Sequence, residues 1–100
     1  MIVLIKEPKK AAYRKNIENT LEELQRTVGG YIETVTLNDK TVMIVDEDGK
    51  LKGDQRFNFD LGDDFVCGTA IFAGVNETDF CDIEEDEAER LEEALKIFRF

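Results

Sequence analysis

Leu21–Glu33, LEELQRTVGGYIE, joins a helical pattern to a strand pattern through two adjacent glycines. Apolar side chains recur at helical spacing along one face of its first half: Leu21, Leu24 and Val28. Asn19–Thr20 offers two capping residues, each followed three positions later by a glutamate. Gly29 suits the left-handed residue that ends many helices, and Gly30 allows a close turn into the next element. The segment therefore predicts a helix that is followed directly by a strand.

Strand patterns lie on both sides of this helix. Ile2–Lys6 is a short β-branched run that Pro8 closes, and Tyr13 with its neighbours can pair back against it as a second strand. After the glycines, Tyr31–Leu37 and Thr41–Val45 are separated by three polar residues. We therefore expect these two strands to form an antiparallel hairpin.

Three further expectations concern the middle of the chain. Asp48–Gly49 is a favoured turn, after which Leu51 is expected to begin a short returning strand. The polar, glycine-punctuated segment 53–64 predicts a loop with one helical turn around Phe57–Leu61. Phe65–Phe72 is apolar on both alternate faces, as expected of a central strand that is covered on both sides.

A second amphipathic helix is predicted from about residue 84 to residue 98. Its apolar stripe consists of Ala88, Leu91, Leu95 and Phe98. Acidic residues crowd its first turn, where the helix dipole tolerates them. Two helices and about five mostly antiparallel strands, in a chain of 100 residues, predict a single α+β domain spanning residues 1–100.

The charge of the chain limits its partners. It carries 23 acidic and 13 basic residues and no histidine, which gives a net charge of -10. Residues 76–100 alone hold 10 acidic and 3 basic side chains. Such a charge disfavours direct binding to nucleic acid phosphates or anionic lipid and favours a partner with a basic surface. No basic leader and no run of about 18 apolar residues is present, so we expect a cytoplasmic protein that enters no membrane.

The residue inventory argues against most catalytic and metal sites. Without histidine, the usual Ser-His and Cys-His pairs cannot form. Cys67 and Cys81 have neither the number nor the spacing of a disulfide framework or zinc site. Asp46–Lys50, DEDGK, resembles the start of a calcium loop, but the rest of that loop is missing. We expect no enzyme, no catalytic residue, no cofactor and no metal ligand.

One strand places a carboxylate among apolar side chains. Glu33 shares a face with Tyr31, Val35 and Leu37, because alternate strand residues point the same way. A carboxylate on a buried face needs a hydrogen-bond donor or must take up a proton. Two alternatives follow for Glu33. Either backbone or basic neighbours near the start of the strand satisfy it, or it lines a cleft for a ligand or partner.

The acidic C-terminal helix also has two interpretations. Its carboxylates keep the protein soluble, or they form a surface for a basic partner by imitating nucleic acid phosphates. The candidate partner surface consists of Glu84, Glu85, Glu87, Glu89, Glu92 and Glu93.

Several segments also resemble a known family. They are NTLEELQRTVGGYIE (19–33), DEDGKLKG (46–53) and Asn58 before LGDDFVCGTAIFAG (61–74), in this order over nearly the whole chain. They resemble the domain of unknown function 3846 family, small proteins carried by phages, plasmids and integrated mobile elements of bacteria. In the family pattern an asparagine often precedes the glutamate of the acidic turn, and Asp46 takes its place here. The resemblance implies a genomic setting and supplies no activity.

These observations favour a small non-enzymatic accessory protein of a phage or mobile element that acts by binding. In one version it is a host-defence inhibitor whose acidic helix engages a host protein. In the alternative version, a small nucleotide-like ligand is bound or sequestered near Tyr31, Glu33 and Asn58. A third alternative is an enzyme that uses Glu33 as a general base. The sequence also leaves a homodimer through an edge strand open.

Overall fold

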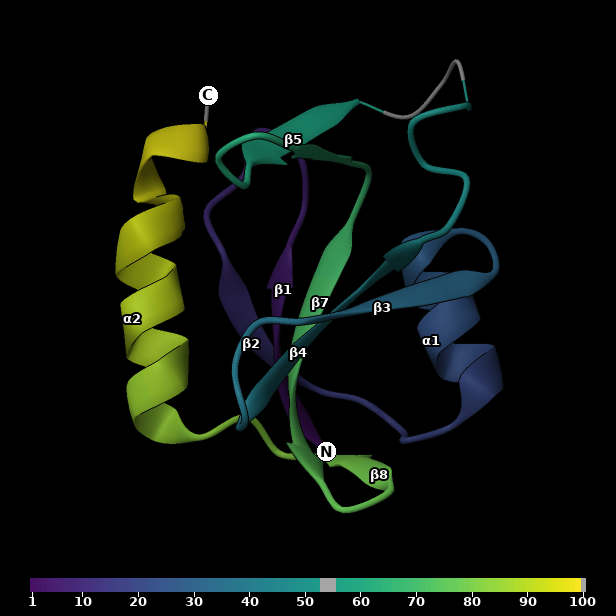
Figure 1. Ribbon diagram of the computed structural model, residues 1–100, viewed down its shortest axis with the longest axis vertical. Helices are drawn as coiled ribbons and strands as arrows, with labels where there is room; N and C mark the ends of the chain where they lie inside the picture. The colour runs from purple at the N-terminus through teal and green to yellow at the C-terminus, as the bar shows by residue number, and fades with distance from the viewer. Residues whose placement is uncertain (53–55, 100) are drawn as a thin grey trace.

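The central sheet is built from strands that lie far apart in the sequence. The computed structural model describes residues 1–52 and 56–99. In this part of the chain, six strands form one sheet: β1 (Ile2–Lys6), β2 (Tyr13–Asn16), β3 (Ile32–Thr36), β4 (Thr41–Asp46), β7 (Ala70–Asn76) and β8 (Asp79–Cys81). Their order is β2-β1-β7-β4-β3, with β8 pairing with β7, and every pairing is antiparallel (Figure 1).

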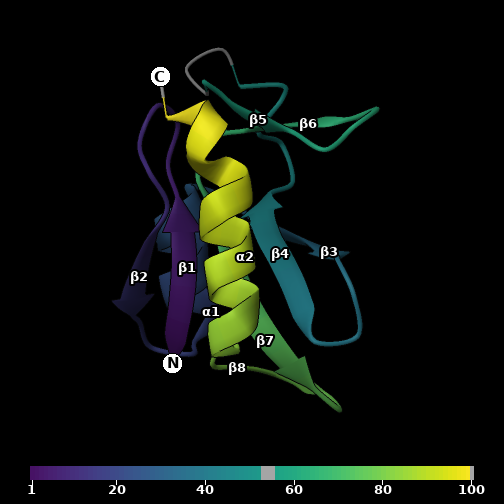
Figure 2. The same cartoon turned by 90° about the vertical axis from the view of Figure 1, so that its left-hand side faces the viewer.

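Two helices cover opposite faces of this sheet. α1 (Leu21–Val28) packs on one face, and α2 (Glu85–Leu95) packs on the other and continues as the 3-10 helix η1 (Lys96–Phe98). Figure 2 shows α2 in front of the sheet and α1 behind it. The strands supply both cores because alternate residues point to opposite faces. The protein is an α+β fold, as predicted.

The ends of α1 agree with the sequence expectation. The Thr20 hydroxyl oxygen accepts a hydrogen bond from the Glu23 N–H at 3.2 Å, so Thr20 is the N-cap. Gly29 ends the helix with φ 90°, and its N–H donates to the Gln25 carbonyl at 2.8 Å. Among residues 1–52 and 56–99, no helix is both long enough and apolar enough to span a membrane.

The expected helical turn around Phe57–Leu61 is wrong. β5 (Phe57–Asp60) pairs with β6 (Phe65–Cys67) in a separate two-stranded sheet. Phe59 is 1% exposed and packs with the core beneath α2, and its neighbour Asn58 is also buried, so burial of these two side chains fixes the segment. Residues 53–55 of the expected loop lie outside the described residues.

Two expectations about strands also need correction. Phe65–Phe72 is not one strand, because Gly68, with φ 81°, ends β6 before the central strand β7 begins at Ala70. Leu51 begins no returning strand; it ends the turn after β4 and is 83% exposed. The predicted sheet of about five mostly antiparallel strands is confirmed, as a sheet of six strands in the described residues.

Candidate binding site between two hairpins

A buried lysine and a buried asparagine fix the β5–β6 hairpin over the end of β1. Lys6 is 0% exposed. Its ammonium group donates to three oxygen atoms, Asn58 Oδ1 at 2.8 Å, Glu7 O at 2.8 Å and Phe98 O at 3.1 Å. The amide of Asn58 donates in turn to the carbonyls of Lys6 at 2.7 Å and Gly68 at 2.8 Å. Burial lowers the pKa of the Lys6 ammonium below 10.5, yet each of its three protons has an acceptor.

The glycine pair after α1 contacts the acidic turn after β4. The buried carboxylate of Asp46 accepts from Lys52 Nζ at 2.7 Å and from the Asp48 N–H at 2.9 Å. Lys52 Nζ also donates to the Gly29 carbonyl at 2.8 Å. A Cβ atom on Gly30 would lie 2.8 Å from Asp46 Oδ1 and 2.7 Å from Lys52 Nζ. A side chain at position 30 would therefore displace the Lys52–Asp46 ion pair, and glycine lets the two segments approach closely at one end of the β3–β4 hairpin.

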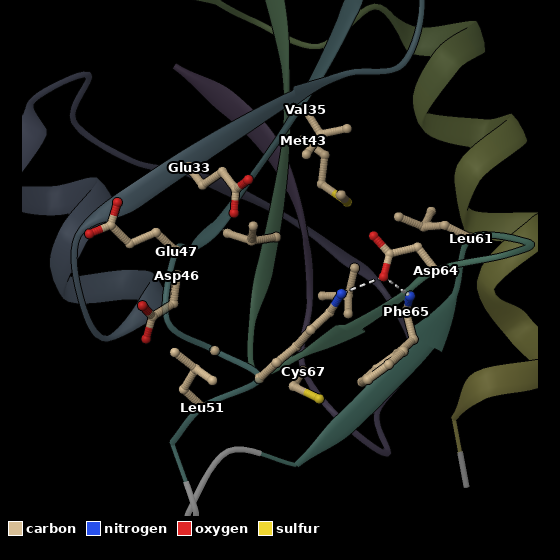
Figure 3. Close-up of a pocket in the computed structure, with 14 residues that line it drawn as sticks. Glu33, Val35, Met43, Asp46, Glu47, Leu51, Leu61, Asp64, Phe65 and Cys67 are labelled. Atoms are coloured by element: carbon tan, nitrogen blue, oxygen red, sulfur yellow. Dashed lines mark hydrogen bonds and ion pairs between the residues drawn. The ribbon is translucent and has the colours of Figure 1, made fainter.

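Next to this contact, a cavity of about 310 Å³ opens between the β3–β4 hairpin and the β5–β6 hairpin (Figure 3). We call it the interhairpin cavity. Its apolar lining consists of Val35, Met43, Val45, Leu51, Leu61, Phe65 and Val66. Its other lining residues are Glu33, Asp46, Glu47, Gly49, Lys50, Asp64 and Cys67.

Glu33 faces this cavity. Its side chain points towards the space between the hairpins (Figure 3), and it forms no hydrogen bond or ion pair within residues 1–52 and 56–99. Across the cavity, Lys50 donates to the Asp64 carboxylate and lies 4.6 Å from the centre of the Phe65 ring. Lys50, followed by the Phe65 N–H, lowers the pKa of Asp64. Of the two alternatives for Glu33, the geometry favours a residue that lines a cleft.

The other two residues of the predicted ligand site lie elsewhere. Tyr31 precedes β3, is 70% exposed and is not among the described residues that line the interhairpin cavity. Asn58 borders a different cavity, and its amide is already bonded to Lys6 and Gly68. The structure therefore places neither residue in the lining of the interhairpin cavity.

Sequence reasoning missed one whole wall of the cavity. Lys50, Asp64, Phe65 and Cys67 come from the turn after β4 and from the β5–β6 hairpin. The available signal was the alternation of phenylalanine with polar residues in Phe57–Asp60, which indicates a strand with one buried face.

A family model covers nearly the whole sequence. It is described as Domain of unknown function (DUF3846) and matches residues 1–96. The chain belongs to this family. No curated protein and no solved structure is significantly similar to the chain. The DUF3846 match includes every residue that lines the interhairpin cavity.

In this DUF3846 protein, most carboxylates of the predicted partner surface on α2 have intramolecular partners. The ion pairs are Glu84 with Lys40, Glu85 and Glu92 with Arg14, Glu87 with Arg90, and Glu93 with Lys96. Glu89 is exposed and has no such partner in the described part of the chain. The same part contains no group of three or more His, Cys, Asp or Glu side chains that could hold a metal ion.

Glu87 is the most tightly held of these carboxylates. Its Oε1 accepts from the Thr41 hydroxyl at 2.6 Å and from the Asn38 amide at 2.8 Å. Arg90 contributes a third hydrogen bond at 3.1 Å. These donors, with Thr41 first, lower the pKa of Glu87 from 4.5 to about 2. Glu87 therefore fastens α2 to the β3–β4 hairpin.

Proposed function

We propose that this DUF3846 protein is a small non-enzymatic accessory protein of a phage or mobile element that binds a host protein with a basic surface. In this proposal the interhairpin cavity receives a lysine or arginine side chain of the partner. The observation that carries the proposal is Glu33, a carboxylate without a partner among the described residues, directed into a cavity whose lining is half apolar. A basic side chain there gains a charge-assisted hydrogen bond from Glu33, while its aliphatic stem contacts Val35 and Met43.

The free edge of the sheet next to the cavity supports a protein partner. β3 pairs with β4 on one side, and no strand in the described residues pairs with its other side. An extended segment can add to such an edge through main-chain hydrogen bonds. Alternate side chains of that segment would then fall on the same face as Glu33 and Val35. The net charge of -10 also speeds the encounter with a basic partner.

The two other hypotheses receive less support from the geometry. Binding through α2 would have to compete with the ion pairs that already occupy most of its glutamates. Catalysis by Glu33 as a general base calls for an apolar, desolvated setting, whereas Glu33 is exposed to solvent.

A capture experiment with matched variants tests the proposal. The immobilised protein is exposed to a lysate of a bacterial host, and the wild type is compared with Glu33→Gln and with Glu77→Gln. Glu77 is an exposed glutamate in the turn between β7 and β8, so it controls for the loss of one charge. We expect a partner that Glu77→Gln retains and Glu33→Gln binds about tenfold more weakly, the value of one charge-assisted hydrogen bond. Equal capture by all three proteins would contradict the cavity as the site.

Alkylation of the two cysteines tests where the partner binds. Cys67 lines the interhairpin cavity and Cys81 does not, and both are free and half-buried. Binding of the captured partner should slow alkylation of Cys67 by iodoacetamide and leave the alkylation rate of Cys81 unchanged.

Native mass spectrometry of the protein as purified distinguishes a protein partner from the alternative, a small ligand. An extra small mass that disappears with Glu33→Gln would show that the cavity holds a small organic cation instead of a protein side chain.

A further inference from the structure

A second cavity borders the β5–β6 hairpin and has the opposite charge. It measures about 620 Å³ and is lined by Lys9, Arg56, Phe57, Asn58, Ile97 and Phe98. We call it the basic cavity. These residues come from the turn after β1, from β5 and its preceding residue, and from η1, which lie at the same end of the molecule (Figures 1 and 2). No acidic residue is among the described residues that line it, although the chain carries a net charge of -10.

The two cations of the basic cavity have no partner among the described residues. The side chains of Lys9 and Arg56 are exposed, and neither forms a hydrogen bond or ion pair within residues 1–52 and 56–99. Most other exposed basic residues do have partners, for example Arg14 with two glutamates and Lys50 with Asp64. Lys15 on β2 is also without one among the described residues, but it lines neither of the two cavities. Two free cations that line one cavity suit a ligand group that carries nearly two negative charges, as a phosphate monoester does.

Apolar surface lies beside these cations. Phe57 is 50% exposed and Ile97 is 72% exposed. The Phe57 ring is held by Phe98, whose ring centre lies 6.4 Å away in an edge-on arrangement. The Phe65 ring, 6.3 Å away, holds Phe57 from a second side. A half-exposed aromatic ring that its neighbours hold in place offers exposed surface against which a planar ligand ring can stack. The volume of the cavity falls within the range of small-molecule sites.

The backbone at Lys9 gives a separate reason to look for a role of its side chain. The Lys10 N–H donates to the Glu7 carbonyl at 3.3 Å, so Pro8 and Lys9 are the two central residues of a turn. Lys9 has φ 64°, a conformation that glycine and asparagine adopt more readily than lysine at this turn position. The turn itself therefore does not account for a lysine here, whereas a cation that is needed in the cavity does.

We propose that the basic cavity binds a nucleoside monophosphate. Lys9 and Arg56 hold the phosphate, and the base stacks on Phe57 and covers Ile97. A nucleotide is favoured over a nucleic acid strand, because the many phosphates of a strand would extend beyond two cations and meet a protein of net charge -10. This site goes beyond the proposed function, since it shares no lining residue with the interhairpin cavity.

Calorimetric titration of the full chain with AMP tests this inference. Adenosine supplies the ring without the phosphate, and inorganic phosphate supplies the charge without the ring. Because both parts contribute, we expect each to bind at least about tenfold more weakly than AMP. Absence of AMP binding, or tighter binding of a single-stranded DNA oligonucleotide than of AMP, would overturn the proposal.

Two variants test AMP binding independently of the stability of the fold. Lys9→Asn removes the cation and favours the observed backbone conformation, so we expect AMP affinity to fall about tenfold while the urea midpoint stays equal or rises. Arg56→Gln should weaken AMP to a similar extent. Lys15→Gln, an exposed lysine on β2, is the matched control and should bind AMP as the wild type does. Unchanged affinity in both Lys9→Asn and Arg56→Gln would show that AMP binds elsewhere.

Discussion

At the scale of single residues, Glu87 shows how a charged side chain can be structural in a helix that looks like a binding surface. It lies on α2 among five other glutamates of the predicted partner surface, yet it accepts hydrogen bonds from Thr41 and Asn38 at the β3–β4 hairpin. Its pKa is lowered to about 2, so the carboxylate is stabilised in the folded protein more than in the unfolded chain.

This shift predicts how stability depends on pH. The pKa of Glu87 falls from 4.5 to about 2 on folding, so its contribution to the free energy of unfolding is complete above pH 4.5 and is lost as the pH falls through 2. Glu87→Gln removes the charge. Urea unfolding should therefore show wild type more stable than the variant at about pH 6, with a gap that closes towards about pH 2. Glu89→Gln, at an exposed position, is the control. A stability difference between wild type and Glu87→Gln that does not change with pH would contradict the lowered pKa of Glu87.

The two glycines of VGG show what the sequence can and cannot predict for a residue. The role of Gly29 was predictable, because a left-handed residue at the end of a helix is a local requirement. The role of Gly30 was not, because the atoms that exclude a Cβ belong to Asp46 and Lys52 on another element. Glu33 was recognised by its strand face, but its cavity depends on a hairpin that the sequence did not reveal.

At the scale of elements, the β5–β6 hairpin explains most of the errors. Its strands have four and three residues, and a register shift between Phe57 and Phe59 breaks the alternation of buried and exposed side chains. α2 is long enough to repeat its apolar stripe, and β4 is a continuous buried run, so both could be predicted. What orders β5 is a contact with β1 and η1 through Lys6, which no local pattern contains.

The buried pair predicts a large effect of one substitution on this hairpin. Asn58→Ala would leave the carbonyls of Lys6 and Gly68 without their donor and take one acceptor from the Lys6 ammonium. Because unsatisfied buried groups cost about 1–3 kcal/mol each, we expect a loss of roughly 2–4 kcal/mol in the free energy of unfolding. Urea denaturation measures it. Asn76→Ala, at the exposed end of β7, is the control; an equal effect there would argue against the buried network.

At the scale of the whole molecule, charge is distributed unevenly over the fold. The interhairpin cavity and α2 carry most of the carboxylates discussed above, whereas the basic cavity carries two cations that have no partner in the described part of the chain. The fold class was predictable from the sequence, because an amphipathic helix before and after a set of alternating strands leaves few arrangements. The separation of acidic from basic surface was not predictable, because it depends on which ends of the strands and helices lie side by side in the fold.

The net charge predicts a response to salt. Exposed ion pairs contribute little, whereas a net charge of -10 repels itself throughout the folded molecule. Raising sodium chloride from about 0.01 M to about 0.15 M shortens the Debye length from about 30 Å to about 8 Å. We therefore expect the urea midpoint at neutral pH to rise with salt. A fall in the midpoint would mean that the ion pairs on α2 and β2 outweigh the repulsion.

The position of β7 also determines when the sheet can assemble during synthesis. β7 lies between β1 and β4 in the sheet but follows both in the chain. On the ribosome, the β1–β2 and β3–β4 pairs emerge early, yet they have no common neighbour until residues 70–76 have left the exit tunnel. The core beneath α1 needs side chains from β1, β4 and β7 together. Folding is therefore delayed until the last third of the chain has been made, and the nascent protein exposes its apolar strands to chaperones until then.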